Sequence, residues 1–512
     1  MPKKKLTDAE IEAILRRFRE EEDMRMDEAE EEIERLRSVR KRVIPRLLQM
    51  LTTGDEREAG VASMLLVELG DKRAIRELQK LIHRRDIPDD RKMLIFPVLV
   101  RLGVPVDGKA FFSSLQDPDT AMRKSIRQAL VHLQTPFEVS DFLEIIEHQM
   151  PIEARAAYIE TIGSLGEPHA IPLLRCLAHS PEEVMALTAI AALDNLKAVE
   201  AIPDLEELGQ YGLTPTIRKE ARKVAGRLTM RASVKGEEHP PYTMPIWPLD
   251  TCYLSAIDGN GTQMAVVVRR RPDGRLAIVN FMYNDHEGVK DAYGGDMMAE
   301  EDVEEVLDLM EMSGLSLAPV PLARCRQTIE EAHLINLKTR RPPPLTFYAW
   351  RFFLAGEDTS EVEEIPVEEV DIKAHPELVE ECDDLFLLDE FDSWFFAPEQ
   401  WPGHARAFRA LEKIRGQPDA KAKAQRLIRK YLAEVVDKKM RRLLRERLRR
   451  QAYMLAQIYE DEEPWQWAMA AAAALEDDSE VPLHEHPLLY EMMDRTLRIP
   501  PRQVTIWREP FR

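Results

Sequence analysis

A short motif recurs along the first half of this chain at a spacing of about 32 residues, over roughly five copies. Three copies read LGDKRAIREL, LGEPHAIPLL and LKAVEAIPDL, and the apolar residue after the alanine is Ile75, Ile171 and Ile202. Less distinct copies place Val139 in FEVSDFL and Val106 or Asp107 in VPVDGKAFF. A unit of this length buries its apolar face only against neighbouring units, so the chain is expected to form an extended helical array.

Two segments of the array show how each unit is built. LQDPDTAMRKSIRQAL (115–130) and SPEEVMALTAIAAL (180–193) both place a capping residue and a proline before a helix with one apolar face. These motifs resemble HEAT repeats, in particular the short bacterial HEAT-like repeats of the phycobilisome-lyase type. The resemblance covers approximately residues 40–228. The resemblance implies an α-solenoid that serves as a scaffold or adaptor, and it does not extend to lyase chemistry.

Composition and charge indicate a soluble chain of several domains. The 512 residues are 44% hydrophobic and 32% charged, and the formal net charge is −21. This charge argues against wholesale non-specific binding of nucleic acid. Four scattered cysteines, no signal-peptide pattern and no apolar run of about 18 residues predict a reducing, cytoplasmic location without a membrane span.

The sequence predicts a multidomain, mainly α protein in six parts. The expected order is a charged helical arm (1–39, one helix over 7–38), a HEAT-like α-solenoid (40–228), a Pro-rich linker (229–250), an α+β domain (251–356), an acidic and aromatic connector (357–401) and a helical C-terminal domain (402–512).

The α+β domain is expected to begin with a three-stranded antiparallel meander. Its strands are Cys252–Asp258, Thr262–Arg270 and Arg275–Asp285, joined by the hairpin signals GNG and PDG. A helix over 300–312, the short apolar run LSLAPV and a helix over 322–337 follow. The expected order is therefore β-β-β-α-β-α.

This order is also the opening order of ribonuclease H-like nucleases, in which acids hold two divalent ions. The resemblance implies a metal-dependent nuclease or nucleotide-processing enzyme, with Asp258, Asp285 and Asp291 as weak catalytic candidates. The run LSLAPV departs from that pattern because it ends without an acid. The competing interpretation is that Asp258 only closes a hairpin turn.

No segment carries a specific cofactor or metal motif. The glycine-rich segment DHEGVKDAYGGD (285–296) is expected to be a loop, either structural or ligand-binding, but it contains no nucleotide-binding pattern. His484 and His486 lack a third ligand nearby and fall short of a zinc motif. We therefore expect no cofactor, no bound metal and, on balance, no enzymatic activity.

The strongest electrostatic feature is the basic helix expected over 438–455. An apolar stripe runs along one face of it, and the other faces carry the candidate binding residues Lys438, Lys439, Arg441, Arg442, Arg445, Arg449 and Arg450. The acidic segment 357–392, with 16 acids and one lysine, lies upstream and carries enough charge to neutralise these bases. Internal pairing, an acidic protein partner and nucleic-acid phosphate all remain open as the role of the helix.

The sequence thus favours a non-enzymatic scaffold or adaptor that binds a partner protein through the solenoid. A nuclease in the α+β domain and nucleic-acid binding through the basic helix are the alternatives, and no membrane partner is expected.

Overall fold

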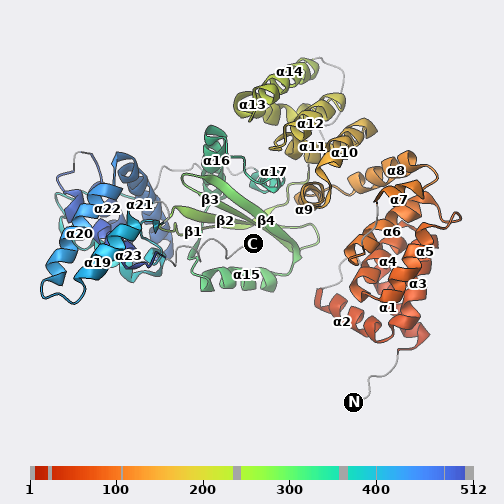
Figure 1. The fold of residues 1–512 in the computed structure, drawn as a ribbon, viewed down its shortest axis with the longest axis horizontal. Coiled ribbons are helices and arrows are strands. Elements are labelled where there is room, and N and C mark those ends of the chain that lie inside the picture. Colours follow the sequence, from red (N-terminus) through yellow and green to blue (C-terminus); the bar gives the residue numbers. More distant parts are fainter. Residues whose placement is uncertain are drawn as a thin grey trace. The chain divides into compact units, whose positions relative to one another are not determined.

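The computed structural model describes residues 6–20, 26–104, 108–233, 244–356, 367–398, 401–477 and 479–501. The chain is mostly helical and divides into two compact units, Met1–His132 and Leu133–Arg512 (Figure 1). The division falls inside the region expected to be one solenoid, so each unit is described by itself. The Val106 and Asp107 copy of the motif lies outside the described residues.

The first unit is all-helical. Its elements are α1 (Asp8–Glu20), α2 (Met26–Ser38), α3 (Arg40–Thr53), α4 (Glu56–Leu69), α5 (Lys72–Ile82), α6 (Asp89–Arg101), α7 (Gly108–Ser113) and α8 (Pro118–Val131). The prediction of one helix over 7–38 is wrong, because this segment forms α1 and α2. The apolar stripe of α1, with Ile11, Ile14 and Leu15, is buried in the core of its own unit.

The second unit begins with three helix pairs. These are α9 (Pro136–Glu144) with α10 (Ile152–Leu165), α11 (Ile171–Ala178) with α12 (Glu183–Asn195), and α13 (Ile202–Tyr211) with α14 (Pro215–Ala232). The repeated isoleucines Ile171 and Ile202 both open the first helix of a pair. The proline that follows each of them occupies the first helical turn, where a missing N–H costs nothing.

A five-stranded antiparallel sheet follows the repeats. Its strands are β1 (Leu249–Ser255), β2 (Thr262–Arg270), β3 (Leu276–Asn284), β4 (Gly288–Met298) and β5 (Leu317–Pro319), in the order β4-β3-β2-β1-β5. The expected meander corresponds to β1, β2 and β3, but the sheet is larger. Since β4 precedes α15 (Glu300–Met312), the order β-β-β-α-β-α is corrected to β-β-β-β-α-β-α, with α16 (Leu322–Thr339) last.

The segment 285–296, expected to be a loop, is mostly the edge strand β4. Gly288 has a φ of +91°, and the next N–H, of Val289, donates to the side chain of Asn336 at 2.6 Å. A side chain at Gly294 would lie 2.6 Å from the carbonyl oxygen of Ile278. Glycines occupy these close approaches, and β4 shifts register twice against β3. The segment therefore lacks the alternation of apolar and polar residues by which a strand is recognised in a sequence.

Two short helices, α17 (Leu345–Trp350) and η4 (Arg351–Leu354), follow α16 in the chain, and α17 packs between the sheet and the repeats. The Phe137 ring lies 4.8 Å from that of Trp350 and 5.6 Å from that of Phe353, and His179 stacks on Tyr348 at 3.9 Å. Because α9 and α11 pack on α17, the first helices of these pairs are covered. The second helix α12 packs on both α10 and α14, and α12 and α14 also pack on the first helices of their own pairs, α11 and α13.

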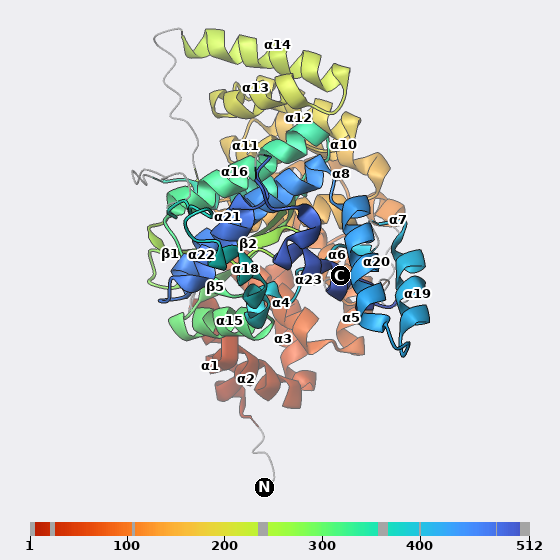
Figure 2. The same cartoon turned by 90° about the vertical axis from the view of Figure 1, so that its left-hand side faces the viewer.

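The remainder forms a helical domain around a core that includes Trp394 (Figure 2). Its elements are α18 (Glu377–Glu380), η5 (Cys382–Leu387), η6 (Asp389–Phe391), α19 (His404–Ile414), α20 (Ala420–Val435), α21 (Lys438–Ile458), α22 (Glu463–Ala473), η8 (Leu483–Glu485) and α23 (Pro487–Arg498). Residues 234–243 of the expected linker, and 357–366 and 399–400 of the expected connector, lie outside the described residues.

Candidate interaction surfaces and a polar cleft

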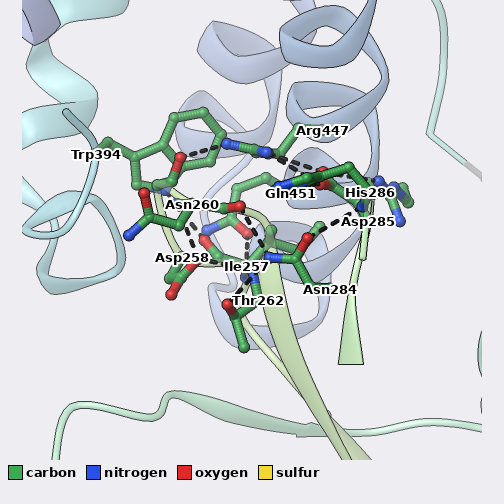
Figure 3. A network of polar contacts seen from close by, with 12 residues as sticks. Ile257, Asp258, Asn260, Thr262, Asn284, Asp285, His286, Trp394, Arg447 and Gln451 are labelled. Atoms are coloured by element: carbon green, nitrogen blue, oxygen red, sulfur yellow. Dashed lines mark hydrogen bonds and ion pairs between the residues drawn. The ribbon is translucent and has the colours of Figure 1, made fainter. Parts of the chain in front are cut away.

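A buried ion pair joins the end of β3 to the basic helix α21 (Figure 3). The Arg447 Nε lies 2.9 Å from Asp285 Oδ2, and its Nη2 lies 3.0 Å from Oδ1. Arg450 adds a third contact to this carboxylate at 3.2 Å. Burial raises the pKa of Asp285, but hydrogen bonds from His286 and Arg447 and the arginine charges outweigh it and hold the pKa below its usual value.

The turn between β1 and β2 is held by the C-terminal domain on its other side. The Ile257 N–H donates to Gln451 Oε1 at 2.7 Å, and Trp394 Nε1–H donates to the Ile257 carbonyl at 3.1 Å. The Gly259 carbonyl accepts from the Arg447 guanidinium, and the Gly259 N–H donates to Ser393 Oγ at 3.1 Å. The sheet and the helical domain therefore meet through polar contacts with specific geometry (Figure 3).

The candidate catalytic residues Asp258, Asp285 and Asp291 all have partners within the chain. Asp258 Oδ1 accepts the backbone N–H groups of Asn260 at 2.9 Å and Thr262 at 2.7 Å, which is the pattern of a turn-closing aspartate. Asp291 lies in β4 and accepts the neighbouring backbone N–H. Burial raises the pKa of Asp258 despite these hydrogen bonds.

The structure brings Asp258 and Asp285 to the same end of the sheet, where the N–H of Asp285 donates to the Gly261 carbonyl at 2.9 Å. Within the described ranges, no group of three or more His, Cys, Asp or Glu side chains could hold a metal ion. His486 is buried at the start of α23, with Nε2 3.0 Å from the Ala471 carbonyl oxygen.

Four of the seven predicted bases on α21 are engaged within the molecule. Arg441 donates to the Leu475 carbonyl at 2.7 Å, and Arg449 lies 3.4 Å from Glu369. Arg445 pairs with its neighbour Glu446 at 2.9 Å, and Arg450 contacts Asp285. In the described part of the acidic segment 357–392, Glu369 is the acid that pairs with α21. The other engaged bases of α21 therefore contact groups outside this segment.

The other predicted bases on α21 are exposed. Lys438, Lys439 and Arg442 make no ion pair with the residues that the structure describes. Bases in the first turn of a helix oppose its dipole, so helix stability does not account for Lys438 and Lys439.

A polar cleft of about 790 Å³ lies between α16, α21 and the end of the sheet. The Arg324 guanidinium lies over the Tyr453 ring on one wall, 5.0 Å from its centroid. Arg449 and Arg450 supply positive charge, whereas the lining residues Glu331 and Glu446 supply negative charge. This mixture suits a polar molecule but favours neither an anion nor a cation.

Ion pairs between successive helix pairs tie the repeats of the second unit together. Arg155 contacts Glu182 at 2.5 Å, Arg175 contacts Asp204 at 2.6 Å, and Arg227 contacts Asp194 at 2.7 Å. Burial raises the pKa of Asp204, but the nearby His179 and the hydrogen bond and charge of Arg175 lower it to about 2. These contacts fix the stacking of one pair on the next.

The second helices present apolar side chains to solvent. Ile152 at the start of α10 is 61% exposed, and Val184 at the start of α12 is 65% exposed. Met230 is exposed near the end of α14. Ile152 and Val184 both lie in the first turn of a second helix, so two consecutive repeats expose an apolar side chain near this end of the helix.

Sequence reasoning missed Arg447 and Gln451 as contact residues. The signal was present, because these residues lie three positions after Leu444 and Leu448 of the apolar stripe and therefore on the buried side of the helix. Arg447 also stands in a run of bases, and such a run indicates a solvent-exposed surface although Arg447 itself is buried.

Stacked antiparallel helix pairs with a continuous core define an α-solenoid. In agreement with this class, the family model of HEAT repeats matches residues 139–226, so this part of the chain consists of HEAT repeats. The comparisons with curated proteins and with solved structures gave no match. None of the helices in the described part is long and apolar enough to cross a membrane.

Proposed function

We propose that this chain is a multidomain scaffold or adaptor that binds a partner protein through its HEAT-like repeats, without a chemical step. HEAT repeats commonly form protein-interaction surfaces. The proposal includes the division of the chain into the six parts that the sequence predicts. It also includes a reducing, cytoplasmic location, which is supported by four buried cysteines that form no disulfide in the described part of the chain.

The observation that carries the proposal is the contrast between the two faces of the repeats. The first helices α9 and α11 are covered by α17, whereas the second helices α10 and α12 expose Ile152 and Val184 in their first turns. Protein interfaces have an apolar centre, and exposed apolar groups on neighbouring helices suit such a centre.

The charge of the last repeat helix supports a partner with an acidic rim. Helix α14 carries six bases and one acid within Pro215–Ala232. Among them, Arg227 pairs with Asp194, while Lys219 is exposed. Charge complementarity at a rim raises the association rate and fixes the orientation of a partner.

The proposal is tested best with point variants of the full chain. Deleting the repeats would expose the aromatic rings of Trp350 and Phe353 that Phe137 covers, and the exposed rings would bind proteins unspecifically. The test variant is Ile152→Asp with Val184→Asp. The matched control is Leu309→Asp with Met312→Asp on α15, where the two side chains are 55% and 83% exposed.

Partners are identified by cross-linking and mass spectrometry from cells that express each form. We expect the repeat variant to lose at least one partner that the wild type and the α15 control retain. An identical set of partners for all three forms contradicts the proposal, because the repeat face would then carry no interaction.

A further inference from the structure

The α19–α20 hairpin and the start of α21 form a strongly basic surface of the second unit. Residues 404–442 contain 13 basic and four acidic residues, a net charge of +9, whereas the whole chain has a net charge of −21. Figure 2 shows α19 and α20 side by side, and α21 follows α20 after two residues. The positive charge is therefore concentrated on three neighbouring elements.

Most of these bases are not used by the fold. In the part of the chain that the structure describes, exposed bases without an ion pair are Arg409, Lys413, Lys421, Arg426, Arg429, Lys430, Lys438, Lys439 and Arg442. On α20, the buried Ile428 and Leu432 define the core side of the helix. Arg426, Arg429 and Lys430 are spaced so that they lie together on the opposite side.

The surface is polar as well as basic. Among the described residues of 404–442, none belongs to the exposed large apolar side chains, and Tyr431 is buried. A protein partner would need an apolar centre at its interface, which this surface does not offer. Interfaces with nucleic acid are more polar and much more positively charged, and their affinity comes mainly from phosphate contacts.

We infer that the α19–α20 hairpin and the start of α21 bind the phosphate backbone of double-stranded nucleic acid without sequence preference. Of the aromatic rings in this segment, Tyr431 is buried and Phe408 is only partly exposed, so the surface offers no row of rings on which unpaired bases could stack and a duplex is preferred to a single strand. Helix α20 is about 24 Å long and spans about seven base pairs of a duplex. The inference is independent of the repeat face and its partner.

The test measures binding of the purified full chain to a fluorescein-labelled 20-base-pair DNA duplex of arbitrary sequence by fluorescence anisotropy. If about six phosphates are contacted, raising NaCl from about 50 to 200 mM weakens binding by about 1,000-fold. An unlabelled duplex of unrelated sequence is expected to compete equally, and a single strand of the same length is expected to compete less well.

Two charge-reversed variants distinguish binding by this surface from a general effect of the net charge of the chain. Arg426→Glu with Arg429→Glu is expected to weaken duplex binding at least about tenfold. The matched control, Lys72→Glu with Arg76→Glu on α5, changes the net charge equally at exposed positions of the first unit and is expected to bind as the wild type does. Circular dichroism checks that both variants are folded.

Three results would overturn the inference. They are absence of duplex binding at about 50 mM NaCl, equal weakening by the two variants, and stronger competition by poly-L-glutamate than by unlabelled duplex. The last result would assign the surface to an acidic protein instead.

Discussion

The carboxylate of Asp285 and the guanidinium of Arg447 form a two-point ion pair whose side chains are 2% and 4% exposed. The two residues are 162 positions apart in the chain, and their contact joins the central sheet to the C-terminal domain. Asp285 was a metal-ligand candidate in the sequence, and α21 was a candidate binding helix. Their contact gives both a structural role at this junction.

We expect Arg447→Met to lower the free energy of unfolding of this junction by about 3 kcal/mol. The substitution leaves the carboxylate of Asp285 buried with only the longer contacts to Arg450 and His286, and removing one partner of a buried pair costs far more than the pair itself contributes. Native-state hydrogen exchange of α21 amides measures the change. The control Arg445→Met breaks an exposed pair with Glu446 and is expected to cost less than about 1 kcal/mol.

Asp258→Asn is expected to preserve the β1–β2 turn, because asparagine keeps an oxygen that accepts the N–H groups of Asn260 and Thr262. Asp258→Ala removes that acceptor and is expected to lower the free energy of unfolding by about 1–2 kcal/mol. Thermal unfolding compares the two variants. A nuclease would behave differently: cleavage that depends on Mg²⁺ or Mn²⁺ and is abolished by Asp258→Asn would restore the catalytic interpretation.

Gly163→Ala is expected to destabilise the repeats by about 1–3 kcal/mol. A methyl group at Gly163 on α10 would collide with Ala192 on α12, whose Cα would be only 3.0 Å away, so the two helices would have to separate. Gly226→Ala on α14 is the matched control, since its added methyl group meets nothing within 4 Å. The control is expected to stabilise by about 0.5–1 kcal/mol, because alanine is the better helix former. Chemical denaturation gives both values.

The C-terminal domain is expected to lose stability as the pH falls from about 6.5 to about 4. Burial lowers the pKa of His486 to about 4, despite the hydrogen bond to the Ala471 carbonyl. The unfolded chain therefore binds more protons than the folded one in this range, and the loss reaches about 3 kcal/mol. Unfolding of the wild type and of His486→Gln across this range tests the effect. Equal pH dependence of both forms would assign the loss to other groups.

Local patterns in the sequence predicted those elements whose stability depends on near neighbours. The isoleucines of the repeated motif begin the first helices of two pairs, and the Thr262–Arg270 strand has the predicted bounds. Helix periodicity and hairpin turns act over a few residues, so the sequence displays them directly. The edge strand β4 was not recognised, because its glycines serve distant contacts with Ile278 and Asn336.

The sequence by itself determined the helical repeats, the central meander and the position of the basic helix, since each depends on the spacing of residues along the chain. Only the tertiary structure decided which charges are free. Arg447 lies on the buried side of α21 and pairs with Asp285, while Arg426 and Lys438 face solvent without a partner in the described chain. The strength of a charge interaction depends on distance and burial in space, and neither can be read from separation along the chain.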